Sequence, residues 1–171
     1  MASREAAARI RRIREEAFAR YEGKSVSHRS CGVCLAEVFG FPTRPFHAFR
    51  RGGLTGEGEC GAVKAAQFIL GAHLASPDPD GPLTEALRDA MTFFDTRWRE
   101  KVSLAAGASA ICKHLTATFP DFNGEERRRF CTRLVAGVAE ALAETLVAFG
   151  VPLPEGDASL REAVPVPPPK P

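Results

Sequence analysis

Hydrophobic residues recur at three- and four-residue steps along most of the chain, which is the spacing of one face of an α-helix. This pattern predicts long helical segments over about 2–21, 60–74, 83–102 and 125–149, and a shorter one over 31–39. No stretch shows the alternation of apolar and polar residues that is typical of a strand. We therefore expect an all-α fold, a compact bundle of four to five helices.

Glycine and proline separate these segments. The stretch FGFPTRPFHAFRRGG, residues 39–53, is expected to be an ordered but irregular loop that its phenylalanines hold on the core. Residues 108–118 add a further turn or two of helix. After Gly150 and Pro152 the composition becomes rich in proline. We expect a single helical domain over 1–150 and a proline-rich, flexible tail over 151–171.

Composition excludes several classes of function. The chain has 171 residues, of which 44% are hydrophobic and 26% charged, as in one ordinary globular domain. A net charge of +2, from 23 basic and 21 acidic side chains, gives no broad field for nucleic acid. No apolar run is long enough for a membrane span. The charged, amphipathic N-terminus lacks the apolar core of a secretory signal, so we expect a cytoplasmic protein. The sequence is compatible with a homo-oligomer.

The chain contains five cysteines, an odd number: Cys31, Cys34, Cys60, Cys112 and Cys131. In a reducing compartment, such a surplus more often means redox chemistry or metal binding than structural disulfides. The alternative is that the thiols are buried as small apolar side chains.

The neighbourhoods of three cysteines point to chemistry. Cys31 and Cys34 form a C-x-x-C pair, whose spacing on a helix brings both sulfurs to one face, close enough for a disulfide or a shared metal. Cys31 follows Ser30, a candidate N-cap. Cys60 follows a glycine-rich stretch and opens the next helix. At both helix starts, unpaired N–H groups are expected to favour the thiolate.

Cys112 and Cys131 fall on the inward faces of two later helices. If Cys31, Cys60, Cys112 and Cys131 converge at one point, they suit zinc or an iron–sulfur cluster, with His28 as a further candidate ligand. If they converge in pairs, they suit dithiol–disulfide exchange.

The order and context of four cysteines resemble a family of redox-active proteins with a C-G-A-x-x-G motif and four characteristic cysteines. Residues 60–65 read Cys-Gly-Ala-Val-Lys-Ala, with alanine in place of the final glycine. Cys31 stands eight residues before Phe39, as in the family's early helix, although Cys34 competes for that match. Cys112 and Cys131 are similar to its last two cysteine segments. The resemblance implies a small helical protein with functional thiols.

These observations lead to three hypotheses. The first is a thiol redox protein, a thiol oxidoreductase or electron carrier acting with an unidentified redox partner. In it, Cys31 and Cys60 react, Cys112 and Cys131 resolve, and Cys34 assists. The second is a metal or iron–sulfur binding module that uses the same cysteines. The third is a helical scaffold with inert buried thiols.

Overall fold

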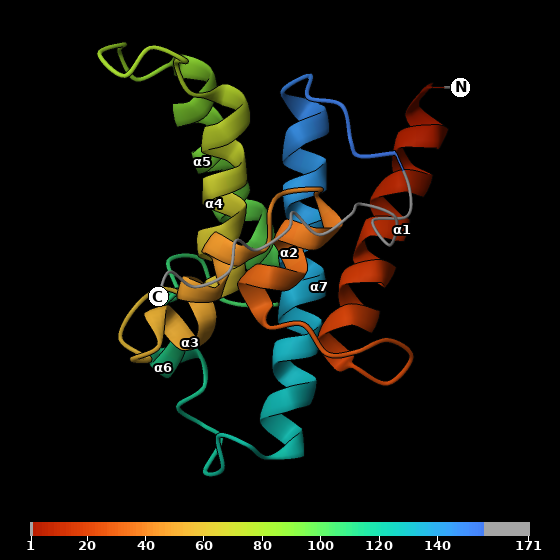
Figure 1. The fold of residues 1–171 in the computed structure, drawn as a ribbon, viewed down its shortest axis with the longest axis vertical. Helices are drawn as coiled ribbons and strands as arrows, with labels where there is room; N and C mark the ends of the chain where they lie inside the picture. The colour runs from red at the N-terminus through yellow and green to blue at the C-terminus, as the bar shows by residue number, and fades with distance from the viewer. Residues whose placement is uncertain (1, 156–171) are drawn as a thin grey trace, which may run out of the picture.

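The computed structural model describes residues 2–155 and shows an all-α fold (Figure 1). The elements are α1 (Ala2–Glu22), α2 (Cys31–Val38), the 3-10 helix η1 (Arg44–Phe49), α3 (Arg50–Gly53), α4 (Gly61–Leu74), α5 (Glu85–Lys101), α6 (Cys112–Leu115) and α7 (Glu125–Ala148). In this part of the chain, extended backbone pairs only in an isolated antiparallel bridge between Glu59 and Ile111. The expected count of four to five helices is not confirmed, because α3 and α6 add two four-residue helices.

Helix α7 is the central element. It packs against α1, α5, α4 and α2, and Figure 1 shows it between α1 on one side and α4 with α5 on the other. Small residues on its surface permit these close approaches. A methyl group at Gly137 would lie 2.9 Å from a side-chain carbon of Val102, just beyond the end of α5. A single helix thereby organises the whole bundle.

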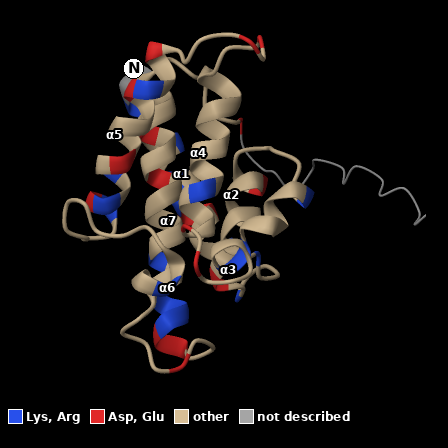
Figure 2. Ribbon diagram, turned by 90° about the vertical axis from the view of Figure 1, so that its left-hand side faces the viewer, with Lys and Arg blue, Asp and Glu red and all other residues tan. Residues whose placement is uncertain are grey.

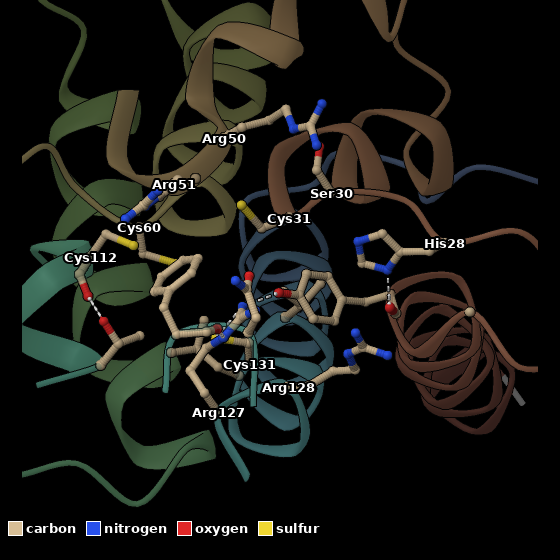
Figure 3. Close-up of a pocket in the computed structure, with 18 of the residues that line it drawn as sticks. His28, Ser30, Cys31, Arg50, Arg51, Cys60, Cys112, Arg127, Arg128 and Cys131 are labelled. Carbon is tan, nitrogen blue, oxygen red and sulfur yellow. Dashed lines mark hydrogen bonds between the residues drawn. The ribbon is translucent and has the colours of Figure 1, made fainter. Parts of the chain in front are cut away.

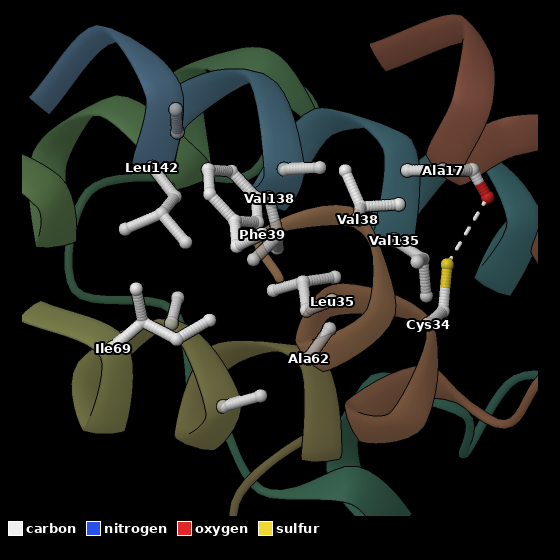
Figure 4. Close-up of a cluster of buried hydrophobic side chains, with 14 of the residues drawn as sticks. Ala17, Cys34, Leu35, Val38, Phe39, Ala62, Ile69, Val135, Val138 and Leu142 are labelled. Carbon is white, nitrogen blue, oxygen red and sulfur yellow. Dashed lines mark hydrogen bonds between the residues drawn. The ribbon is translucent and has the colours of Figure 1, made fainter. Parts of the chain in front are cut away.

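The hydrophobic core lies where α2, α4 and α7 meet (Figure 4). Leu35 of α2, Ile69 of α4 and Leu142 of α7 are all fully buried there. Burial of such a side chain stabilises the fold by about 1.5–3 kcal/mol. The inward face predicted for the last helix is confirmed, since Val135 and Val138 are buried in the same cluster.

The prediction of an irregular loop over 39–53 is wrong for residues 44–49, which form the 3-10 helix η1. The four residues of α3 that follow do not form a regular right-handed helix, since Arg51 and Gly52 have positive φ values. Pro45 lies in the first turn of η1, where its fixed φ suits a helical start and its missing N–H costs nothing. Phe46 is buried and packs edge-on against Phe41 and Phe49. The phenylalanines hold the segment on the core as expected, but through helical turns.

Ordered packing continues past the expected domain end at Gly150. Leu153 is buried in the core, and its carbonyl accepts a hydrogen bond from Arg9 of α1. The rest of the predicted tail, residues 156–171, lies outside the described residues.

The charged side chains are mixed in sign along the helices (Figure 2). Over residues 2–155, no helix is both long enough and apolar enough to cross a membrane.

Candidate functional site: a cavity lined by four cysteines

One cavity of about 620 Å³ brings together segments that are far apart in the sequence. It lies beside the starts of α2 and α4, the short helix α6 and the first half of α7 (Figure 3). Four of the five cysteines line it: Cys31, Cys60, Cys112 and Cys131. All four are free thiols.

Three of these thiols stand at helix starts. Cys31 is the first residue of α2, Cys112 is the first residue of α6, and Cys60 immediately precedes α4. Backbone hydrogen bonds around the isolated bridge hold two of them together. The Cys60 N–H donates to the Ala110 carbonyl at 2.7 Å, and the Cys112 N–H donates to the Gly58 carbonyl at 2.9 Å. The loop before α4 is thereby fixed to the start of α6.

A glycine lets Cys31 approach the start of α4. A Cβ atom at Gly61 would lie 2.5 Å from the Cys31 sulfur and would also overlap the Phe49 carbonyl. The Cys31 sulfur therefore rests against the backbone of the residue that follows Cys60. Gly61, the glycine of the C-G-A-x-x-G motif, is therefore required for steric reasons, because a side chain there would collide with the Cys31 sulfur.

A left-handed turn closes the cavity wall beside Cys31. Four consecutive residues, 51–54, have φ values between 49° and 71°, although only two of them are glycine. Left-handed backbone costs roughly 1–2 kcal/mol at a residue with a side chain. A Cβ at Gly52 would lie 2.6 Å from the Gly58 carbonyl oxygen and 2.8 Å from Cβ of Cys112. Burial raises the pKa of the Cys31 thiol, and the Arg51 N–H in this turn opposes part of that rise.

The expectation that the helix starts favour thiolates at Cys31 and Cys60 is not met. Burial raises the pKa of both thiols above the ordinary value. Backbone N–H groups do oppose this rise, from Gly32 at Cys31 and from Val63 and Ala62 at Cys60, but the loss of hydration outweighs them. Burial raises the pKa of Cys112 in the same way.

Cys131 is the thiol that a cation contacts. The Arg127 guanidinium, one helical turn earlier on α7, donates to the Cys131 sulfur at 3.8 Å and to the Tyr21 hydroxyl at 3.3 Å. Burial raises the pKa of Tyr21, so the phenol stays protonated at neutral pH. A guanidinium beside a sulfur stabilises the thiolate. The spacing from Arg127 to Cys131 was visible in the sequence as an i,i+4 pair, but sequence analysis did not single it out.

Arginines dominate the charge of the cavity wall. Arg50, Arg51, Arg127 and Arg128 all line it, against a single carboxylate, Glu22. Glu22 already pairs with Lys24 at 3.1 Å. Within residues 2–155, none of the four arginines forms a salt bridge.

Two of these arginines share an aromatic ring. Arg51 and Arg127 each place the guanidinium 4.3 Å from the centroid of Phe122. This cation–π contact holds both charges at the wall without neutralising either of them.

Ser30, the candidate N-cap of α2, makes no capping hydrogen bond. Ser30 is among the residues at the cavity wall, but its hydroxyl oxygen is buried beneath the accessible surface and has no hydrogen-bond partner among the described residues. A buried hydroxyl without a partner is unusual, because leaving it unsatisfied costs about 1–3 kcal/mol.

Cys34, predicted to share one face with Cys31, does not line the cavity. It is fully buried in the core, and its thiol donates to the Ala17 carbonyl of α1 at 3.4 Å (Figure 4). Burial also raises its pKa. The C-x-x-C pair is therefore divided between the cavity and the core.

The geometry does not support the hypothesis that these cysteines and His28 bind a metal ion. His28 lies at the cavity wall, where its Nδ1 atom hydrogen-bonds to the Tyr21 carbonyl. In the described part of the chain, no three His, Cys, Asp or Glu side chains form a group that could hold a metal ion.

Comparison with known proteins yields no match to any family model, to any curated protein or to any solved structure. The resemblance to the redox-active family therefore depends on the cysteine pattern alone and stays an expectation.

Proposed function

We propose that this protein is a thiol redox protein that cycles between dithiol and disulfide at the cavity. One observation carries the proposal: four thiols from four separate segments line one cavity, whereas the fifth is isolated in the core. The family resemblance, which rests on the same four cysteines, agrees with it.

Cys131 is the proposed attacking thiol. Cys131 is half-buried, and its sulfur accepts a hydrogen bond from the Arg127 guanidinium. A thiolate is the nucleophile in disulfide exchange, and a neighbouring cation favours it. The other three thiols of the cavity are candidates to resolve the mixed disulfide. Their pKa is raised by burial, so they stay protonated until the exchange begins.

The reaction is an exchange with a disulfide R–S–S–R. The Cys131 thiolate attacks one sulfur of the substrate, forms a mixed disulfide and releases RS⁻. A second cavity thiol then gives up its proton, attacks the Cys131 sulfur and releases the other RS⁻. The protein loses two electrons and two protons, and the substrate becomes two R–SH molecules. A reducing dithiol reverses the reaction.

Thiol counting with disulfide mapping tests the proposal. Reduced, folded protein is treated with a mild disulfide oxidant, its free thiols are counted, and its disulfides are located by mass spectrometry. We expect thiols to disappear in pairs, the new disulfide to join two of the four cavity cysteines, and a reducing dithiol to restore them. Five free thiols in folded, oxidant-treated protein would contradict redox cycling.

Two variants sharpen the result. Cys131→Ser removes the proposed nucleophile and should slow the loss of thiols at least tenfold. Cys34→Ala removes a thiol that does not line the cavity, so its oxidation should proceed at the wild-type rate with one thiol fewer in the count. If the two variants behaved alike, Cys131 would not be the attacking thiol.

A further inference from the structure

We propose that the cavity takes a small organic disulfide that carries carboxylate groups. This inference rests on the proposed function, because it names the substrate of the same thiols. Two observations support it: the charge of the wall, and the size and partly apolar lining of the cavity.

The charge of the wall selects an anion. Four arginines face one carboxylate that already pairs with a lysine, so the cavity is strongly positive in a molecule whose net charge is only +2. Elsewhere on the surface many basic side chains are paired, such as Lys101 with Glu140 and Arg97 with Glu144. Guanidinium groups bind carboxylates through two parallel hydrogen bonds. Arg127 already donates to Phe122, Tyr21 and Cys131. The other three arginines of the wall are therefore the ones available to a carboxylate ligand.

The size of the cavity selects an organic ligand. Its volume of about 620 Å³ falls in the range of sites for small organic molecules, roughly 300–1,000 Å³. An inorganic oxyanion would fill only a small part of it. Leu54, Phe122, Leu134 and Val135 also line the cavity and offer apolar contacts for carbon atoms. A ligand with a carbon skeleton between two carboxylates would contact both the arginines and these apolar side chains.

The chemistry of the substrate follows from these walls. Its carboxylates lie against the arginines, and its S–S bond meets the Cys131 sulfur, which Arg127 already contacts. The two exchange steps are those given above, with two molecules of a carboxylate-bearing thiol as the product.

Three disulfides of nearly equal size test the preference. Each has two-carbon arms and differs in charge: 3,3′-dithiodipropionate is anionic, bis(2-hydroxyethyl) disulfide is neutral, and cystamine is cationic. The rate of thiol loss from the folded protein is divided by the rate of a neutral model thiol with the same disulfide. We expect the anionic compound to react faster than the cationic one by about tenfold or more, with a ratio that falls as salt is added. Equal normalised rates, or a preference for cystamine, would overturn the inference.

Arginine variants locate the preference in the cavity. Arg50→Gln combined with Arg128→Gln removes two exposed charges of the wall that have no ion pairs to lose. This double variant should reduce the ratio at least threefold, whereas Arg133→Gln, on the exposed face of α7 and outside the cavity, should leave it unchanged. A preference that survives in the double variant would show that the cavity does not produce it.

A ligand without sulfur separates this inference from the proposed function. Suberate has the length of dithiodipropionate, with two methylene groups in place of the disulfide, and it cannot exchange. If suberate binds and Arg50→Gln with Arg128→Gln weakens it, but no disulfide oxidises the protein, the carboxylate site stands and the redox function fails. If all three disulfides oxidise the protein without preference and suberate does not bind, the redox function stands and the carboxylate site fails.

Discussion

At the scale of single residues, the same side chain has different chemistry in different places. The Cys34 thiol donates a hydrogen bond to a backbone carbonyl in the core, whereas the Cys131 sulfur accepts a hydrogen bond from a guanidinium at the cavity. The sequence placed Cys31 and Cys34 together, because a spacing of three residues brings side chains to one face of a helix. The sequence could not reveal that the Cys34 thiol would instead donate a hydrogen bond to the backbone of the neighbouring helix α1.

Alkylation of the folded protein with iodoacetamide should distinguish these thiols. Cys131 is expected to react first, because the Arg127 guanidinium favours its thiolate. Cys34 should react last, since it is fully buried and must wait for an opening of the bundle. Mass spectrometry of peptides at successive times measures the order. Labelling of Cys34 before Cys131 would contradict this account.

The contribution of Arg127 is tested on the same reaction. Arg127→Gln keeps hydrogen-bonding groups but removes the charge next to the Cys131 sulfur, so labelling of Cys131 should slow about threefold to tenfold. Arg127→Lys keeps the charge and should recover part of the rate. Arg133→Gln on the same helix is the matched control. A Cys131 rate that is the same in Arg127→Gln and Arg133→Gln would exclude an electrostatic role.

At the scale of elements, the sequence predicted the long helices and the short helix α2 well, placed α6 within a longer segment, and missed η1 and α3. Apolar periodicity over 125–149 matches α7 to within a residue. The segment that forms η1 and α3 is too short for such a period, and its left-handed turn depends on contacts with Gly58 and Cys112. Contacts between segments distant in the sequence therefore determine this part of the wall.

Two glycines of α4 provide a matched test of the close approach. Gly61→Ala would push a methyl group into the Cys31 sulfur and the Phe49 carbonyl, so it should destabilise the protein by about 1–3 kcal/mol. Gly71→Ala meets nothing within 4 Å and should stabilise the helix by about 0.5–1 kcal/mol. Urea unfolding measures both free energies. Equal effects of the two substitutions would contradict the packing of Cys31 against α4.

At the scale of the whole molecule, the convergence of four cysteines in one cavity is the property that sequence analysis could pose only as alternatives. A thiol on the inward face of a helix is predicted to lie inside the bundle, but the sequence does not give its position along the bundle axis. That position is determined by the packing of α2 and α7 on α4, and by the antiparallel bridge between Glu59 and Ile111. The arginines were missed because Arg50 and Arg128 come from segments that only the fold brings to one wall.

The buried thiols also determine how the stability of the reduced protein depends on pH. In an unfolded chain a thiol ionises near its ordinary pKa of about 8.5. In the folded protein the pKa of Cys31, Cys34, Cys60 and Cys112 is raised by burial. The folded state therefore retains protons that the unfolded state loses, so this contribution is constant below about pH 8 and decreases above about pH 8.5. Each thiol contributes at most about 1.4 kcal/mol per pH unit to the decrease.

Urea unfolding under reducing conditions at about pH 7, 8.5 and 9.5 measures this decrease. The free energy of unfolding should fall between the two higher values, and Cys34→Ala should show a shallower fall, because it removes one thiol with a raised pKa. The substitution also leaves a small cavity in the core, which lowers the stability at every pH by a constant amount, so the slope is the informative quantity. A stability that stays level or rises from about pH 8.5 to 9.5 would mean that the folded protein tolerates buried thiolates. The cavity arginines would then have to stabilise several charged sulfurs, and Cys131 would lose its distinction as the attacking thiol.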